Sequence, residues 1–241
     1  MIIDCISDLH GHFPKLDGGD LLIVAGDLTS NDQPPAWATF LEWLCDCTVK
    51  YEEIVVISGN HDNALQYGFN LNNFCPNVYY LCDSGTETTY YDDRFPQEDE
   101  GFLPSGKSTL KIWGSPWAKR FPGMNPHCMA FTVDTDEELA KKWALIPPDT
   151  DILVTHCPAW GMRDGPDPET RYGSKSLLHW VAGHVNTLKL HVCGHIHEGY
   201  GHFDIRGLQT QFGDPTTTVF INCSHVNERS QPVNKPIRIE L

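Results

Sequence analysis

At 241 residues the chain is long enough for one α/β domain with a sizeable core, and we predict a single domain over residues 1–241. Its net charge of −15, with 17 lysines and arginines and no basic run, argues against binding of long nucleic acid, which is held through many basic side chains. No apolar run approaches ~20 residues and none resembles a signal peptide, so we expect no membrane association, and nine irregularly spaced cysteines favour reduced thiols in the cytoplasm.

The first half of the chain alternates apolar, β-branched runs with one amphipathic stretch. Strands are predicted over residues 2–6, 21–25 and 54–57. Apolar side chains at helical spacing predict a helix from Pro35 to Thr48. Residues 83–108 are acidic and irregular, which indicates a surface loop.

The second half adds two predicted helices and two predicted strands. The helices run from Asp136 to Leu145 and from Ser174 to Val185. One strand covers 152–154, and the run 188–193 alternates like a strand with one buried face. Alternating strands and helices followed by strand-rich sequence favour two sheets flanked by helices.

Polar residues of the metal-binding type stand just past the ends of five predicted strands. In layered α/β proteins, ligands bind at that edge of the sheet. One such motif alone would mean little, but five together are hard to obtain by chance. The five motifs are Ser7-Asp8-Leu9-His10, Gly26-Asp27-Leu28, Gly59-Asn60-His61-Asp62, Thr155-His156 and Gly194-His195-Ile196-His197.

The residue types in these motifs suit a pair of metal ions. Oxygen and imidazole donors without thiolate fit Mn²⁺, Fe, Zn²⁺ or Mg²⁺. The Asp27 carboxylate has two oxygens, enough to bridge two cations. On an extended segment Asp8 and His10 would point to the same side, and His195 and His197 repeat that spacing. The pKa of water held between two such ions is lowered by several units, so the resulting hydroxide can attack a phosphate ester at neutral pH.

In this order the five motifs resemble the calcineurin-like metallophosphoesterase superfamily. Further stretches are similar to its class III phosphodiesterase-like branch, which includes vertebrate brain metallophosphoesterase-domain proteins. The resemblance covers nearly the whole chain and implies an α/β fold, a four-layer α-β-β-α sandwich of two mixed sheets. The stretches that carry it are 7–12, 112–117, 146–156, 189–201, 221–224 and 231–237.

The resemblance assigns three side chains to each of two divalent ions and one carboxylate to both, with Mn²⁺ as the favoured metal. Since every one of these positions is filled, full two-metal activity is expected. One ion would be held by Asp8, His10 and His197, the other by Asn60, His156 and His195, and Asp27 would bridge them.

The resemblance places His61 opposite the phosphate, as the general acid for the leaving oxygen or as an orienting donor. Asn60 and His61 would both contact the substrate. Asp62 could support the tautomer of His61 from behind. For Trp117 and Trp160, which lie in predicted loops, a structural role is favoured over lining the pocket. The same holds for three further polar residues, His127, Asp164 and His225.

Three classes of function remain open. The leading one is a phosphodiesterase for small phosphodiesters or nucleotides, with 2′,3′-cyclic nucleotides favoured because their five-membered ring is strained. A phosphomonoesterase on the same site, either a nucleotidase or a protein phosphatase, is the second. Protein phosphatases resemble a Gly-Asp-x-Val-Asp-Arg-Gly pattern, whereas here Gly26-Asp27 continues without the arginine. The third is a non-enzymatic nucleotide-binding protein. Nothing in the sequence identifies a protein partner.

Overall fold

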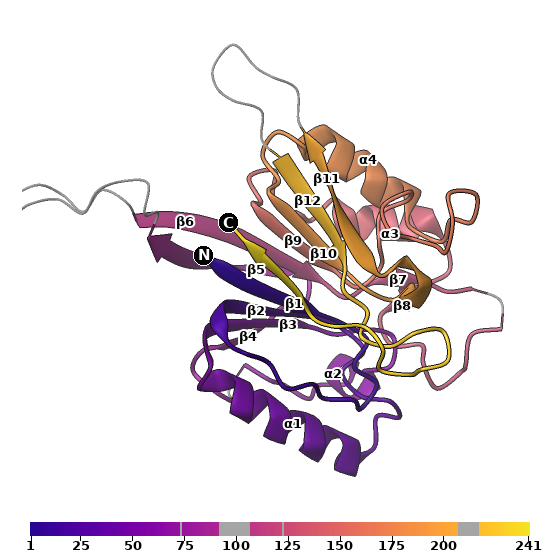
Figure 1. Ribbon diagram of the computed structural model, residues 1–241. Helices are drawn as coiled ribbons and strands as arrows, with labels where there is room; N and C mark the ends of the chain where they lie inside the picture. Colours follow the sequence, from indigo (N-terminus) through magenta and orange to yellow (C-terminus); the bar gives the residue numbers. More distant parts are fainter. Residues whose placement is uncertain (73, 92–106, 122, 207–216) are drawn as a thin grey trace, which may run out of the picture.

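A computed structural model describes residues 1–72, 74–91, 107–121, 123–206 and 217–241. Two large sheets pack face to face in this part of the chain (Figure 1). In the first sheet, β1 to β4 run parallel and β13 pairs antiparallel with β1. The first sheet has the order β13 (Ile237–Glu240), β1 (Ile2–Ile6), β2 (Gly19–Ala25), β3 (Tyr51–Ile57), β4 (Val78–Tyr80).

The second sheet has a parallel centre and antiparallel edges. Strands β6, β9, β10 and β12 are parallel neighbours, while β5 and β11 pair antiparallel at the two edges. Two short strands, β7 (Ala118–Lys119) and β8 (Thr132–Val133), pair separately. The second sheet has the order β11 (Gly201–Arg206), β12 (Thr217–Asn222), β10 (Leu190–Cys193), β9 (Ile152–Thr155), β6 (Lys107–Ser115), β5 (Ser84–Tyr91).

Helices cover the outer face of each sheet, which completes the four-layer α-β-β-α sandwich predicted from the sequence (Figure 1). Helices α1 (Pro34–Thr48) and α2 (Asn63–Gln66) lie on the side of the first sheet, and α3 (Asp136–Trp143) and α4 (Lys175–His184) on the second; η1 (His197–Gly199) is a single 3₁₀ turn. None of these helices, in the described part of the chain, is long and apolar enough to span a bilayer.

The side chains of the central strands alternate between two apolar cores. In β2, Leu21 and Ile23 face the second sheet, whereas Leu22 and Val24 face α1. This period of two is what a strand buried on both faces requires. A third core joins the second sheet to α3 and α4, with Trp143 almost fully buried.

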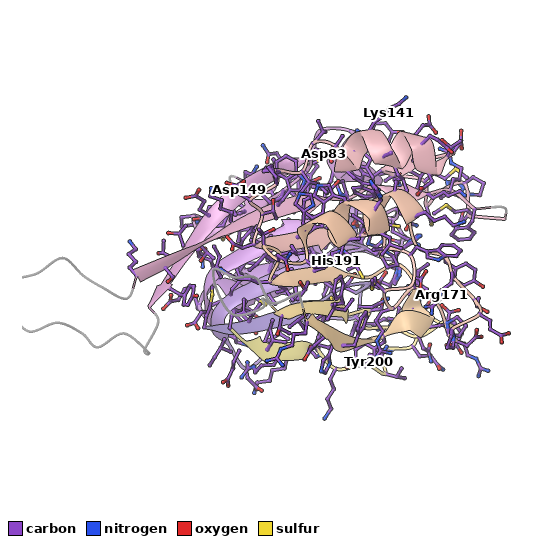
Figure 2. All side chains as sticks on the ribbon, turned by 90° about the horizontal axis from the view of Figure 1, so that it is seen from above. Asp83, Lys141, Asp149, Arg171, His191 and Tyr200 are labelled. Carbon is purple, nitrogen blue, oxygen red and sulfur yellow. The ribbon has the colours of Figure 1, made fainter. Side chains whose placement is uncertain are left out.

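Two expectations from the sequence are wrong. Residues 84–91 are not a surface loop but strand β5, paired over its whole length with β6, to which residues 107–108 of the predicted loop also belong. Residues 92–106 lie outside the described residues. Strand β10 is buried on both faces rather than one. Its polar residue His191 lies beneath helix α4 (Figure 2), where its ring contacts Phe220 and Thr155. A polar residue in an alternating pattern therefore did not mark a solvent-facing side here.

Candidate metal centre

The carboxyl ends of strands from both sheets converge on one group of polar side chains. The first sheet contributes residues that follow β1, β2 and β3, and the second contributes residues that follow β9 and β10. Parallel strands present their carboxyl ends at a common edge, which is why residues far apart in sequence meet here. The seven residues brought together are Asp8, His10, Asp27, Asn60, His156, His195 and His197.

The first cluster contains Asp8, His10 and His197, whose ligand atoms lie within 4.8 Å of one another. The Nε2 atom of His197 is 3.3 Å from Asp8 Oδ1 and 3.4 Å from His10 Nε2. Asp8 is fully buried, and its carboxylate accepts hydrogen bonds from Ser224 Oγ at 2.7 Å and from the backbone N–H of His195. These contacts fix the carboxylate that faces the two imidazoles.

The second cluster contains Asn60, His156 and His195. The Nε2 atom of His156 lies 3.1 Å from Asn60 Oδ1, and the rings of His156 and His195 are 4.9 Å apart. The Asn60 amide nitrogen donates to the carbonyl of Cys128 at 3.1 Å, so the amide oxygen turns toward His156. Asn60 and His156 are thus each held by a backbone carbonyl outside the cluster, that of Cys128 and that of Ala25.

Asp27 stands between the two clusters. Its Oδ2 atom lies 3.6 Å from His10 Nε2, and its Oδ1 atom lies 3.5 Å from His156 Nε2. The backbone N–H of His61 donates to Oδ1 at 2.9 Å, and the side chain is 2% exposed. Each carboxylate oxygen therefore faces a different cluster, which is the arrangement that a bridging ligand needs.

Four of these seven residues have left-handed backbone conformations. The φ angles of Asp8, His10, Asp27 and His195 lie between 43° and 66°. Each such residue costs about 1–3 kcal/mol when it is not glycine, and such costs concentrate at functional sites. The extended geometry expected around Asp8 and His10 is therefore wrong, because tight turns past the strand ends, not strand alternation, bring these side chains together.

Two motif glycines make room for the carboxylates. A β-carbon on Gly194 would lie 2.3 Å from Asp8 Oδ2, and one on Gly59 would lie 2.2 Å from Asp27 Oδ1. Both distances are far below contact distance. The glycines of Gly59-Asn60 and Gly194-His195 are thus required by the close approach of a carboxylate rather than by their own backbone angles.

Backbone carbonyls orient two of the imidazoles. The Nδ1–H of His156 donates to the Ala25 carbonyl at 2.9 Å, and the Nδ1–H of His197 donates to the Asn227 carbonyl at 3.0 Å. In the neutral ring, this leaves the Nε2 lone pair of each histidine directed into the cluster. A carbonyl partner on the far nitrogen is the usual support of a metal-ligating histidine.

In the metal-free protein, nearby carboxylates raise the pKa of some histidines of the site, whereas burial lowers the pKa of others. Burial by itself lowers the pKa of His156, but the adjacent Asp27 raises it to about 9. Burial also lowers the pKa of His197, but the hydrogen bond with Asp8 raises it more, so that the pKa is about 9. By contrast, burial lowers the pKa of His195 to about 3. Without metal, protons on His156 and His197 therefore balance the two carboxylates at neutral pH.

The donor set fits divalent metal ions. Asn60 Oδ1 and His156 Nε2 are both acceptors when the ring is neutral, and a cation between such acceptors removes their repulsion. Among the described residues, no lysine or arginine contacts Asp8 or Asp27. The nearby Cys157 stays a thiol because burial raises its pKa to about 12. The donors available are therefore oxygen and imidazole nitrogen, the set that suits Mn²⁺, Fe, Zn²⁺ or Mg²⁺.

His61 stands at the edge of this group and faces the cavity. Its Nε2 atom is 3.9 Å from Asp27 Oδ2, and its ring meets that of His10 edge-on at 4.5 Å. Its side chain is 23% exposed, more than any of the buried carboxylates. Its Nδ1 atom lies 3.4 Å from both the Ser30 carbonyl and Cys128 Sγ. The ring is thus held at Nδ1, with Nε2 on the side of Asp27 and the residue on the cavity wall.

Asp62 does not support the tautomer of His61, contrary to the expectation from the sequence. Its buried carboxylate accepts the backbone N–H groups of Leu28, Thr29 and Gly59. Burial and the nearby Asp27 raise its pKa to about 8. Asp62 therefore ties the loop after β2 to the loop after β3 and so fixes where Asp27 stands.

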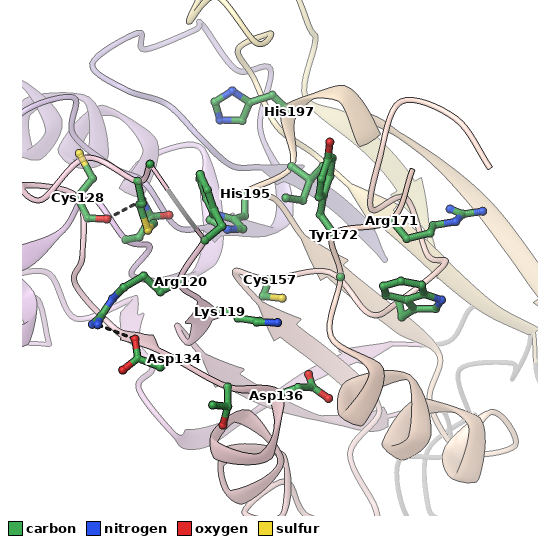
Figure 3. Close-up of a pocket in the computed structure, with 18 of the residues that line it drawn as sticks. Lys119, Arg120, Cys128, Asp134, Asp136, Cys157, Arg171, Tyr172, His195 and His197 are labelled. Carbon is green, nitrogen blue, oxygen red and sulfur yellow. Dashed lines mark hydrogen bonds and ion pairs between the residues drawn. The ribbon is translucent and has the colours of Figure 1, made fainter. Parts of the chain in front are cut away.

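A large cavity opens in front of the two clusters (Figure 3). Its volume is about 1250 Å³, and its wall includes Asp27, Asn60, His61, His195 and His197. Trp160 lines it, so the structural role favoured from the sequence is not its only one. Trp117 does not, since it packs between two cores and donates to Asp83.

Several residues near the site had no role in the sequence-based assignment. Asn222, the last residue of β12, donates to the Ile196 carbonyl, and Ser224, two residues further on, donates to Asp8. Their position at the end of an apolar strand and just past it is the signal that could have found them. Phe121 and Tyr172 also line the cavity but lie in loops without a motif. Asp164 and His225 are buried and hydrogen-bonded to their own surroundings, as expected for structural residues, whereas His127 lines a smaller neighbouring cavity.

The chain belongs to the calcineurin-like phosphoesterase family, whose model matches residues 1–199. Members of this family bind two divalent metal ions. The predicted membership, based on the order of the five motifs, is thereby confirmed. The class of protein is a metallophosphoesterase of the phosphoric ester hydrolase type.

The chain is similar to metallophosphoesterase domain-containing protein 1 of Homo sapiens and of Mus musculus, at 34% identity over 98% of this chain and 70% of each relative. It is also 32% identical to UPF0046 protein T07D4.2 of Caenorhabditis elegans, over 98% of this chain and 59% of that protein. One solved structure superposes on 99% of this chain and 98% of its own, with a TM-score of 0.59 and 13% identity, a likeness of fold.

Proposed function

We propose that this protein is a dinuclear metal-dependent phosphodiesterase for small phosphodiesters, with 2′,3′-cyclic nucleotides as favoured substrates. The observation that carries the proposal is the Asp27 carboxylate, whose two oxygens face His10 at 3.6 Å and His156 at 3.5 Å beside a cavity of about 1250 Å³. A phosphate group alone fills a small part of that volume, so both ester groups of a diester fit.

The proposed ligand assignment follows the two clusters. We propose that both ions are Mn²⁺. Two divalent ions at this site would polarise the phosphate and lower the pKa of a bound water molecule. The chain's own contribution is to hold seven donors at fixed positions before the substrate arrives. We assign Asp8, His10 and His197 to one ion, Asn60, His156 and His195 to the other, and Asp27 to both.

His61 is proposed to act on the leaving group. His61 lines the cavity, its Nε2 atom lies 3.9 Å from the proposed bridging carboxylate and its Nδ1 atom lies 3.4 Å from the Ser30 carbonyl, so the ring can hold a proton toward the ester oxygen that departs. The Asn60 amide, fixed by the Cys128 carbonyl, would contact the phosphate beside it. Neither residue needs to move far, because both stand on the loop that Asp62 fixes.

The charge of the protein limits the proposed substrate. With a net charge of −15 the surface repels long polyanions, whereas two divalent ions would attract a single phosphate locally. Small diesters and nucleotides are therefore preferred over DNA or RNA strands, which we expect to be cut slowly or not at all.

The test is hydrolysis by the Mn²⁺-loaded protein of bis-p-nitrophenyl phosphate, p-nitrophenyl phosphate, and 2′,3′- and 3′,5′-cyclic nucleotides. The proposal expects turnover of the model diester and of at least one cyclic nucleotide. Efficient cleavage of the monoester with no diester cleaved would replace it with a phosphomonoesterase. No turnover at all by protein with both ions bound would favour a non-enzymatic nucleotide-binding role.

A further inference from the structure

Two aromatic side chains are exposed on the wall of the cavity next to the metal centre. Tyr172 is 57% exposed and Phe121 is 52% exposed, and both line the same cavity as His195. The Phe121 ring lies 6.3 Å from the His195 ring at an angle of 55°. Neither ring takes part in the proposed chemistry, so their exposure at this place needs another explanation.

Leaving large apolar rings in water costs free energy that burial would recover. Single exposed aromatic residues are common on protein surfaces and need no explanation. Here, however, two such rings face one cavity beside a proposed metal ligand. Trp160 and Ile196 add further apolar surface to the same wall. A ligand that enters the cavity can therefore bury the rings that folding left exposed.

The backbone around Tyr172 is held rigidly although its ring is exposed. The buried Asp164 accepts the Gly173 N–H at 3.0 Å and the Arg171 guanidinium at 2.9 Å, and its own carbonyl accepts the Tyr172 N–H at 3.0 Å. Figure 3 shows the Arg171 side chain directed away from the Tyr172 ring. One fully buried carboxylate thus fixes the residues on both sides of an exposed tyrosine.

Backbone hydrogen bonds connect the segment that carries Tyr172 to the neighbouring residues 158–160. Ser174 N–H donates to the Pro158 carbonyl and Trp160 N–H donates to the Ser174 carbonyl, both at 2.9 Å. A β-carbon on Gly173 would lie 2.7 Å from the Ala159 backbone, so the two segments are in close contact. An exposed ring on a backbone held by hydrogen bonds loses little conformational freedom when it stacks on a ligand.

We propose that Tyr172 and Phe121 form a subsite that binds the organic part of the phosphodiester, and that it takes a planar heteroaromatic ring of nucleobase size. The inference rests on the proposed function, since the ring must belong to an ester bound at the metal centre. Stacking of a base on an aromatic side chain contributes about 5- to 150-fold to binding. Tyr172 is thus a specificity-determining residue for the ester group.

The first experiment compares two cyclic diesters that share the strained ring but differ in the base. The substrates are 2′,3′-cyclic AMP and glycerol 1,2-cyclic phosphate, assayed with wild type, Tyr172→Ala and Tyr172→Phe. We expect Tyr172→Ala to lower the ratio of the two kcat/KM values about 5- to 150-fold, mainly through KM for the nucleotide, and Tyr172→Phe to restore it. Tyr67→Ala is the matched control, because Tyr67 is 84% exposed and lies outside the cavity wall.

A binding measurement separates this inference from the proposed activity. Calorimetric titration of the metal-loaded protein with AMP and with ribose 5-phosphate reports the contribution of the base without turnover. We expect AMP to bind more tightly in the wild type and the difference to vanish in Tyr172→Ala. Such a result with no diester turnover would keep the subsite and reject the phosphodiesterase.

Three outcomes would overturn the subsite while leaving the phosphodiesterase in place. One is diester turnover in which Tyr172→Ala slows both cyclic substrates by the same factor. Another is turnover in which Tyr172→Ala leaves both substrates unaffected. The third is equal affinity of the wild type for AMP and ribose 5-phosphate. A preference lost equally in Tyr67→Ala would count against it as well, because Tyr67 does not line the cavity.

Discussion

Two buried aspartates near the first strand of the chain have opposite surroundings. Asp4 lies within β1 and is 4% exposed, and Asp8 lies just past the end of β1 and is fully buried. Asp4 is paired with the Arg238 guanidinium through two contacts of 2.8 Å and accepts a hydrogen bond from the Tyr51 hydroxyl. Asp8 meets imidazoles instead, with His197 Nε2 at 3.3 Å.

The difference separates a structural carboxylate from a functional one. Asp4 has a permanent cation beside it, so its charge is neutralised within the protein. In the described part of the chain, the ionisable partners of Asp8 and Asp27 that can carry a positive charge are histidines, which can give up their protons and leave lone pairs for a metal. Residue type and burial are alike at Asp4 and Asp8. The partners decide which carboxylate stabilises the fold and which one stays available for a ligand.

The largest expected effect comes from removing the bridging carboxylate. Asp27→Ala should abolish dinuclear metal binding and lower turnover more than about 10³-fold, because one side chain faces both clusters. Metal analysis of the purified variant, alongside a turnover assay with bis-p-nitrophenyl phosphate, measures both. His10→Ala is the control and should leave the second ion partly bound. Two tightly held ions in Asp27→Ala would refute the assignment.

A smaller effect is expected from the residue that faces the cavity without belonging to either cluster. His61→Ala should keep both metal ions and lose about 10²- to 10⁴-fold in kcat, since a general acid is removed. The loss should be smallest for p-nitrophenolate, a leaving group that needs little protonation, and largest for alkyl esters. An equal loss across leaving groups, or release of metal, would remove the general-acid role from His61.

Neutralising the structural aspartate, Asp4, should lower stability and leave metal binding and turnover unchanged. Asp4→Asn is expected to lower the free energy of unfolding by about 2 kcal/mol, because a charge-assisted pair with Arg238 and a bond from Tyr51 are weakened. Metal content and kcat should stay at the wild-type level. Chemical denaturation and the same metal analysis check both points. Asp149→Asn, which breaks the exposed pair with Lys111, is the control and should change stability too little to resolve.

The smallest effect is a pH dependence from His191, a buried histidine outside the metal clusters. Burial lowers its pKa to about 3, below the unfolded-state value of about 6.5. As pH falls, the unfolded chain takes up the proton first, so the folded state loses stability below about pH 6.5. Between pH 7 and pH 5.5 this amounts to about 1 kcal/mol of unfolding free energy.

The variant His191→Leu isolates that contribution. Wild type and variant are unfolded in denaturant at both pH values, and only the difference between them is used, which removes the contribution of the other histidines. The wild type should lose more stability than His191→Leu on going to pH 5.5. A pH dependence that is identical in the two proteins would show that His191 is protonated, or exposed, in the folded state.

The sequence by itself determined the family, the layered fold and the identity of the clustered residues. Apolar runs of strand length followed by Asp, Asn or His carry this information locally, because a strand end at a sheet edge exposes its next residues whatever the rest of the fold does. Helices α1, α3 and α4 were predicted to within two residues at each end. Ser174, for example, caps α4 through its side chain, a signal that lies within a few residues.

Only the tertiary structure decided how those residues meet. The left-handed turns at Asp8 and His10, the role of Asp62 between two loops and the burial of His191 all depend on neighbours distant in sequence. The same holds for strand β5, which lies in a stretch predicted to be a loop and forms a strand because β6 offers a partner edge. Tyr172 and Phe121 belong to loops without any motif, and only the packing of segments distant in sequence brings them to one cavity. Local patterns specify elements, whereas packing between elements specifies the site.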